Sequence, residues 1–71
     1  MQKTLYGRIE EELIDRNMTV RNFLEETHMS HNTLKQLKYK KPTINTYKKI
    51  ANFLNEPASQ VINYTFEDKN A

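Results

Sequence analysis

The sequence predicts an all-α fold, a compact bundle of about five short helices. One glycine and two prolines occur in 71 residues, so few positions interrupt a helix. Apolar residues recur three and four positions apart in several segments, the spacing that places them on one face of a helix. Three of these segments begin just after a threonine or serine, residues that cap helix N-termini. A core of this size is thin, and self-association or partner binding is therefore expected.

The first expected helix carries an apolar stripe and ends at Asn17, a residue that suits the position after a helix C-terminus. Thr19 caps the second helix. Residues 27–29 form a tight connection to the third helix, which Ser30 caps. The residues expected to form the apolar stripes are Leu5, Ile9 and Leu13 with Tyr6 and Ile14 flanking, then Val20, Phe23 and Leu24, then Leu34 and Leu37.

The third helix is broken by Lys40, Lys41 and Pro42, because the residue before a proline avoids the helical region. Thr43 caps the fourth helix, and Asn55 ends it. Its inward stripe consists of Ile44, Tyr47, Ile50, Ala51 and Leu54.

The end of the chain holds one more short helix. Pro57 suits the first turn of this fifth helix, and residues 63–66 are β-prone. We expect one domain over residues 1–66 and a flexible tail over residues 67–71. The apolar residues of the fifth helix are Val61 and Ile62.

Charge is distributed unevenly along the chain. Residues 1–26 carry four basic and six acidic groups, and residues 56–71 carry one basic and three acidic groups. Residues 27–55 hold six lysines and no acidic residue. Such a basic field around one polar helix is typical of nucleic-acid binding, although lysine-rich surfaces also occur as plain solvated faces. The six lysines are Lys35, Lys38, Lys40, Lys41, Lys48 and Lys49.

Several function classes lack their residues in this sequence. There is no cysteine, which excludes disulfides, and the two histidines have no further ligands nearby, so we expect no metal site. No apolar run approaches the roughly 18 residues of a membrane span, and the first residues lack the apolar stretch of a secretion signal. We therefore expect a cytoplasmic protein. No nucleophile–base set and no glycine-rich phosphate loop is visible, so neither enzyme activity nor a cofactor is expected.

Residues 19–38 have the spacing of a helix-turn-helix, two short helices joined by a tight turn, with a polar outer face on the second. Their sequence is Thr-Val-Arg-Asn-Phe-Leu-Glu-Glu-Thr-His-Met-Ser-His-Asn-Thr-Leu-Lys-Gln-Leu-Lys. This segment resembles the Cro/CI-type helix-turn-helix family, whose λ-repressor-like bundle continues with a proline, a capped helix and a short fifth helix. Residues 41–61 follow that pattern closely. The resemblance covers residues 5–63 and implies binding to double-stranded DNA.

Three positions depart from the family pattern. Val20 stands where the family has a glutamine that touches a phosphate, Leu24 replaces a small alanine at the helix crossing, and His28 replaces the turn glycine. Histidine can adopt a left-handed backbone at some cost. In size and layout the chain resembles, more narrowly, the modulator-of-repression proteins of phages from lactic-acid bacteria, which act with or against a CI repressor. That resemblance implies a role in a lytic–lysogenic switch inside a bacterial host cell.

The family resemblance places the third helix in the major groove, so its exposed residues become candidates for DNA contact. Asn32 and Gln36 can each pair with adenine, and Lys35 suits guanine or a phosphate. His31 can donate to a base or a phosphate. Each of these side chains could instead be an ordinary solvated residue. The full set expected to bind DNA is Arg21, Ser30, His31, Asn32, Lys35, Gln36, Lys38, Lys40 and Lys41.

Acidic residues give the first helix a negative face. The plain interpretation is a solvated surface. The alternative is a docking face for a basic partner such as a repressor's recognition helix, since complementary charge speeds association. The residues concerned are Glu10, Glu11, Glu12 and Asp15.

Two functions remain open. In the first, the protein is a small transcriptional regulator of a phage-type switch that binds an operator through the third helix. In the second, it is an interaction module, a modulator of repression or antirepressor, that binds a CI-type repressor and alters its DNA binding. The family pattern favours the first function, whereas the three departures and the acidic first helix favour the second. The two are not exclusive, and self-association is a further expectation.

Overall fold

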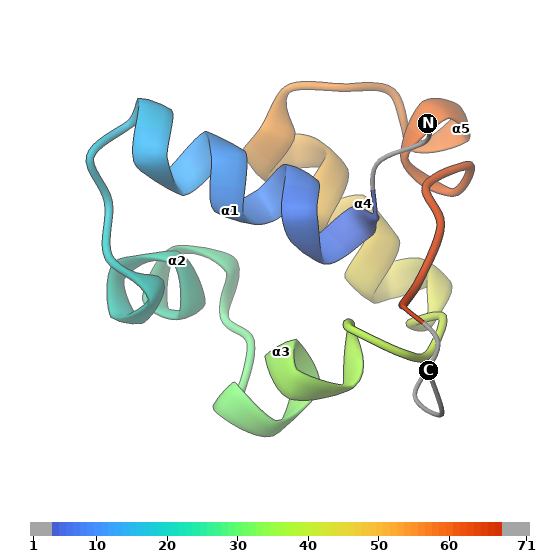
Figure 1. The fold of residues 1–71 in the computed structure, drawn as a ribbon, viewed down its shortest axis with the longest axis horizontal. Helices are drawn as coiled ribbons and strands as arrows, with labels where there is room; N and C mark the ends of the chain where they lie inside the picture. Colours follow the sequence, from blue (N-terminus) through green and yellow to red (C-terminus); the bar gives the residue numbers. More distant parts are fainter. Residues whose placement is uncertain (1–3, 68–71) are drawn as a thin grey trace.

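Five α-helices make up the fold in the computed structural model, which describes residues 4–67 (Figure 1). The helices are α1 (Leu5–Asp15), α2 (Val20–Thr27), α3 (His31–Gln36), α4 (Ile44–Leu54) and α5 (Ala58–Val61). The predicted all-α bundle of about five short helices is confirmed. None of the described helices has the length and apolar character needed to cross a bilayer.

Hydroxyl caps begin four of the five helices. The side-chain oxygens of Thr19, Ser30 and Thr43 accept hydrogen bonds from the backbone N–H three residues later, at 3.2, 3.1 and 3.4 Å. These three caps were predicted from the sequence. Thr4 caps α1 in the same way at 3.0 Å, and this cap was not predicted. Pro57 precedes α5 and contributes no side-chain bond.

Residues in the left-handed region follow three of the helices. Asn17, His28 and Asn55 have φ angles of 54°, 57° and 59°, at the three positions where the sequence predicts a helix to end. α3 ends differently. Its last residue is Gln36, two residues before the end of the predicted helix-turn-helix segment at Lys38. The N–H groups of the next residues, including Lys38, donate to carbonyls three residues back. These are the tighter hydrogen bonds of a 3₁₀ turn, which replace the α-helical pattern there.

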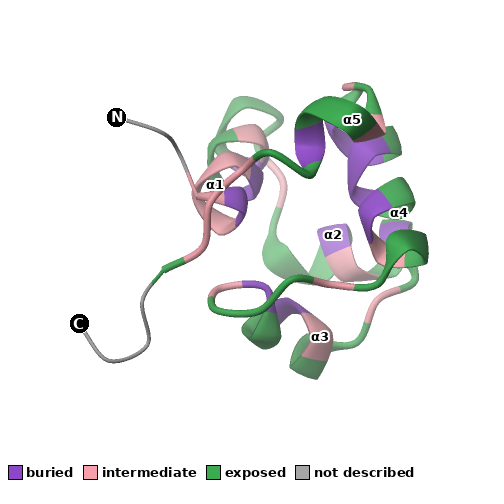
Figure 2. Ribbon diagram, turned by 90° about the vertical axis from the view of Figure 1, so that its right-hand side faces the viewer, coloured by how far each residue is buried: buried purple, intermediate pink, exposed green. Residues whose placement is uncertain are grey.

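The hydrophobic core collects buried residues from all five helices, and α4 packs against both α2 and α5 (Figure 2). The rings of Phe23 and Phe53 meet edge to face, with centroids 4.7 Å apart and an interplanar angle of 76°. Phe53 was not among the residues predicted to face inward, because α4 has helices on two sides and buries more than one stripe. The core residues are Leu5, Ile9, Leu13, Phe23, Leu34, Leu37, Tyr47, Ile50, Ala51, Phe53, Leu54 and Val61.

Three apolar residues assigned to inward stripes, Ile14, Val20 and Ile44, lie at the surface, so those predictions were wrong. Ile14 is 78% exposed and Ile44 is 60% exposed. Val20 is exposed as well, and so is Ile62, which the sequence places in the fifth helix without assigning it to a stripe. Each stands at or next to the end of its helix. The helical period places such a residue on the correct face, but it does not reveal where the neighbouring element stops.

The two ends of the described chain lie side by side. The N–H of Leu5 donates to the carbonyl of Thr65 at 2.9 Å, and an isolated parallel β-bridge joins Thr65 to Thr4. The β-prone segment therefore pairs as a single bridge. Glu67, the first residue of the predicted flexible tail, donates its N–H to the carbonyl of Lys38 at 2.8 Å. The rest of that predicted tail lies outside the described residues.

Candidate nucleic-acid interface

The turn between α2 and α3 is fixed by bonds from both sides. His28 adopts the left-handed conformation, and its N–H donates to the carbonyl of Leu24. Thr27 is buried, and its hydroxyl donates to the carbonyl of Phe23 at 2.8 Å. From α4, the ammonium group of Lys49 donates to the carbonyl of His28 at 3.4 Å. The angle between α2 and α3 is therefore held by the core, by the turn and by α4.

One face of α3 is buried and the opposite face is open to solvent. Leu34 is buried in the core, whereas His31, Asn32, Lys35 and Gln36 are exposed. The exposed residues occur at positions i, i+1, i+4 and i+5, so they share one side of the helix. The structure thus brings together four of the predicted DNA-binding residues in one open surface, which we call the α3 face.

Ser30 lies at the start of the α3 face but is occupied as the helix cap. Its hydroxyl oxygen accepts the N–H of Thr33 at 3.1 Å and lies 2.9 Å from the hydroxyl of the same residue. Ser30 is exposed, so it can still meet a ligand, but its orientation is set by the cap.

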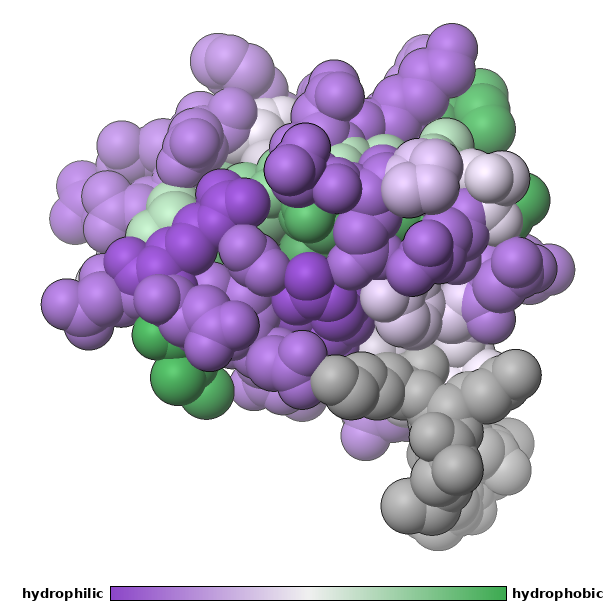
Figure 3. Space-filling view, turned by 90° about the horizontal axis from the view of Figure 1, so that it is seen from above, coloured by the Kyte–Doolittle hydropathy of each residue, from purple (hydrophilic) through white to green (hydrophobic). Residues whose placement is uncertain are grey.

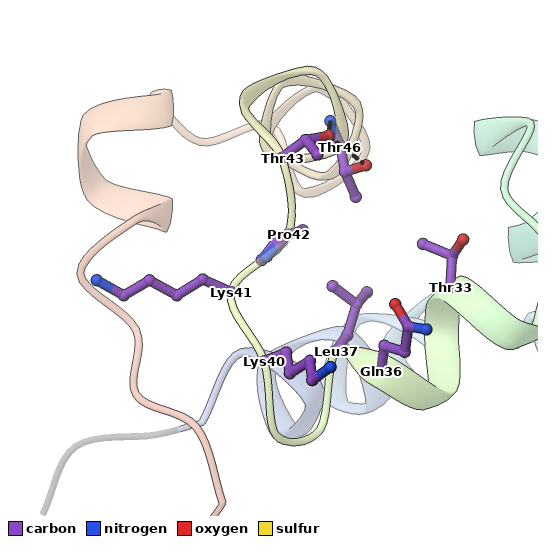
Figure 4. A pocket seen from close by; sticks show the side chains of 8 residues that line it. All are labelled: Thr33, Gln36, Leu37, Lys40, Lys41, Pro42, Thr43 and Thr46. Carbon is purple, nitrogen blue, oxygen red and sulfur yellow. Dashed lines mark hydrogen bonds between the residues drawn. The ribbon is translucent and has the colours of Figure 1, made fainter.

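A shallow pocket of about 200 Å³ lies between the end of α3 and the start of α4 (Figure 4). Lys40 stands on the same side of the connecting loop as Gln36, whereas Lys41 extends from the opposite side. Both lysines are exposed. The start of α4, capped by Thr43, adds the partial positive charge of a helix N-terminus. Both lysines line the pocket, and Lys40, on the side of Gln36, extends the α3 face.

Two other residues predicted to bind DNA have partners within the molecule. Lys38 is half-buried, and its ammonium nitrogen lies 4.9 Å from the centroid of the Tyr6 ring, a cation–π contact. Arg21 forms an ion pair with Glu25 at 3.4 Å. Because that pair is on the surface it is weak, and the Arg21 guanidinium stays accessible near the start of α2.

A comparison with known families fits this geometry. A family model described as the Cro/C1-type HTH DNA-binding domain matches residues 8–67, which include α2, α3 and the turn between them. The chain belongs to this family. A search of curated proteins and a search of solved structures gave no match. In this Cro/C1-type domain α2 and α3 form the helix-turn-helix, and the α3 face is the candidate nucleic-acid interface.

The acidic face predicted on the first helix of the Cro/C1-type domain divides into two parts. Glu12 is half-buried, and its carboxylate lies 2.9 Å from Arg8 and 2.6 Å from Arg16. The hydrogen bond from Arg16, followed by that from Arg8, lowers the pKa of Glu12. Its charge is compensated within the molecule and is less available to a partner. The other three predicted partner-binding residues, Glu10, Glu11 and Asp15, are exposed.

Lys49 has a role at this site that the sequence does not predict. It was counted in the basic field, but its bond to the turn carbonyl of His28 was not predicted. The two residues are 21 positions apart, and no local pattern links them. Within the described part of the chain, no three histidine, cysteine, aspartate or glutamate side chains gather in a way that could hold a metal ion.

Proposed function

We propose that this Cro/C1-type domain is a transcriptional regulator that binds double-stranded operator DNA and places α3 in the major groove. The observation that carries the proposal is the α3 face, where polar side chains are exposed together above a helix whose other side is buried. Asn32 and Gln36 are suited to adenine, and Lys35 is suited to guanine. His31 supplies a further hydrogen-bonding group at the start of the helix. On this proposal the protein acts by binding, not by catalysis.

Positive groups flank the α3 face and would fix its register on the duplex. Lys40 stands beside Gln36 at one end of α3, next to the N-terminus of α4. At the other side of the helix-turn-helix, Arg21 is exposed near the start of α2. Contacts of this kind go to phosphates, which position a protein on DNA without reading its sequence.

A second candidate function is supported by the first helix. Glu10, Glu11 and Asp15 are all exposed on α1. We propose that this surface binds the basic face of a CI-type repressor, so that the protein modulates repression in a phage-type lytic–lysogenic switch. Opposite charges would speed the encounter between the two proteins.

A salt-dependent binding titration tests the first function. The protein is titrated against duplexes selected from a random pool and against random duplex. Specific binding should exceed random binding, and the logarithm of the binding constant should fall linearly with the logarithm of salt concentration. Equal binding to selected and random duplex at about 50–100 mM salt would reject sequence readout through α3.

The second function is tested by adding a CI-type repressor to the same titration. Reversing Glu11 and Asp15 to lysine should abolish the complex with the repressor, because both side chains are exposed and carry the charge that attracts it. Circular dichroism of the double variant checks that the fold is kept. Unchanged repressor affinity would remove α1 from the interface.

A further inference from the structure

An exposed isoleucine surrounded by carboxylates projects from α1. Ile14 is 78% exposed. It lies four residues after Glu10 and three after Glu11, so all three share one side of the helix, and Asp15 adjoins them. Seen from the side of α1 and α5, the surface is mostly hydrophilic, and hydrophobic atoms form separate patches (Figure 3). We call Ile14 and its three acidic neighbours the Ile14 knob.

A groove of opposite charge lies on the flank of α3. Its volume is about 480 Å³, and we call it the α1–α2–α3 groove after the helices that line it. Its apolar lining includes Val20, Leu34 and Tyr39. Its basic lining is Lys35 and Lys38, and none of its lining residues is acidic.

We propose that the Ile14 knob of one molecule docks in the α1–α2–α3 groove of a second copy, so that the chain self-associates head to tail. An apolar centre with an acidic rim meets an apolar groove with a basic rim, so both the hydrophobic and the electrostatic terms favour the contact. Val20 and Tyr39 offer no positive charge that could pair with a phosphate. An apolar protein side chain therefore fits this part of the groove better than a nucleic-acid backbone does. Among the described residues, neither Glu10 nor Asp15 forms an ion pair within its own molecule.

The two surfaces differ, so the contact is heterologous and does not close on itself as a symmetric dimer does. Each added copy leaves one knob and one groove free, and the mean size of the assembly grows with protein concentration. The groove also contains His31 and Lys35 of the α3 face. On the proposed DNA-binding function, a docked copy therefore covers part of the DNA-reading surface, and self-association competes with operator binding.

Sedimentation velocity without DNA tests the docking itself. The average mass should rise above the 8.5 kDa of one chain as concentration increases at about 0.05 M salt, and should return toward it at about 1 M, where the screening length is about 3 Å. Ile14→Ser should weaken association about tenfold, because the buried apolar side chain is lost. Ile62→Ser is the matched control, since Ile62 is also an exposed isoleucine at a helix end. A wild type that stays monomeric at low salt, or an equal effect of both variants, would overturn the proposal.

Mixing two variants distinguishes this head-to-tail contact from a symmetric one. Ile14→Ser removes the knob and keeps the groove, whereas Val20→Asp places a negative charge in the groove and keeps the knob. At a concentration that just suffices for the wild type to associate, each variant alone should be mainly monomeric, and the mixture should form a discrete 1:1 complex of twice the monomer mass. Tyr39→Asp is a second groove variant, and circular dichroism checks the fold of all three. A mixture that stays monomeric would contradict the proposal. Because DNA is absent, failure here leaves the proposed DNA binding untouched, and failure of DNA binding leaves this result standing.

Discussion

The side of the molecule formed by α1 and α5 and the side formed by α3 differ in how they hold their basic side chains. On the α1–α5 side, Arg8 bonds Glu56 at 2.8 Å and Glu12 at 2.9 Å, and Arg16 bonds Glu12 at 2.6 Å. The hydroxyl of Tyr64 donates to Glu56 at 2.9 Å. On the α3 side, by contrast, the part of the chain that the structure describes offers no ion pair to Lys35, Lys40 or Lys41. The α1–α5 side uses its two arginines to join elements through Glu12 and Glu56, whereas the α3 side leaves these lysines open to a partner.

The residue types match this division. An arginine guanidinium presents a planar fork of donors, which suits fixed, multiple bonds, whereas a lysine ammonium is a flexible point charge. Arg16 also lies over the Phe53 ring, 4.3 Å from its centroid, and donates to the Phe53 carbonyl. Burial lowers the pKa of Arg8, but its bonds and attraction to Glu12 and Glu56 outweigh that effect and raise it. Arginine therefore ties α1 to the end of α4 and to the loop before α5, while Lys35 and Lys40 of the α3 face form no ion pair among the described residues.

Truncating the shared core should damage both sides at once and gives the largest expected effect. Leu54 is buried in α4, and Leu54→Ala should lower the free energy of unfolding by about 2–5 kcal/mol, since it leaves a cavity in the core. Ile44→Ala is the control on the same helix, and because Ile44 is exposed it should change stability by less than about 0.5 kcal/mol. Urea unfolding measures both variants. A Leu54→Ala variant as stable as Ile44→Ala would contradict the assigned core.

On the proposed DNA-binding function, removing the side chain of Asn32 should affect the α3 side alone. Asn32→Ala should weaken binding to the specific operator by about 1–3 kcal/mol, because two hydrogen bonds to adenine are lost, and it should relax the sequence preference at one position. Thermal unfolding should not change, since Asn32 is exposed. Binding to random duplex serves as the internal reference. Equal losses on specific and random duplex would assign Asn32 to the phosphate backbone instead.

Removing the central carboxylate should affect the α1–α5 side alone. Glu12→Gln should lower the free energy of unfolding by about 1–3 kcal/mol at neutral pH, because charge-assisted bonds to Arg8 and Arg16 are weakened. The folded state lowers the pKa of Glu12 below its ordinary value of 4.5, so its stabilisation is present above that pH and is lost as pH falls through the lowered pKa. The variant and the wild type should therefore converge in acid.

Urea unfolding at neutral pH and at about pH 2–3 measures this convergence. Glu26→Gln is the matched control, an exposed carboxylate on α2 that should have little effect at either pH. A stability difference for Glu12→Gln that is the same at both pH values would show that the charge of Glu12 is not its source. DNA affinity should be unchanged, which separates this prediction from the one for Asn32.

Local chemistry explains what the sequence could predict. Hydroxyl residues cap helices and asparagine or histidine tolerates a left-handed backbone wherever they occur, so the caps at Thr19, Ser30 and Thr43 were readable in advance. The exposed face of α3 followed from helical spacing. Helical spacing also allows Glu12 to pair with Arg8 and Arg16, since both partners are four residues away, whereas the acidic pattern of the first helix predicts an open face.

Contacts between distant segments were beyond the sequence. Glu56 is 48 residues from Arg8, and their pairing depends on how α1 crosses the end of α4. The exposure of Ile14 depends equally on where its neighbours end. The direction of Lys41 was not predictable, because it lies in a loop whose course is set by Pro42 and the start of α4.

The smallest expected effect distinguishes two lysines that the sequence could not tell apart. Lys40 is exposed beside Gln36, whereas the ammonium of Lys38 is held over the ring of Tyr6. Lys40→Gln should reduce the salt slope of DNA binding by about one, as expected for the loss of one phosphate contact, and should weaken all duplexes alike. Lys38→Gln should reduce the slope by less, because part of its charge already serves the contact with α1.

Tyr6→Leu frees Lys38 and provides the control. Lys38→Gln made in that background should give a slope change close to that of Lys40→Gln. Equal slope changes for the two lysines in the wild-type background would show that the cation–π contact does not hold Lys38 away from DNA, and that the open charge of the α3 side extends further toward α1 than the structure indicates.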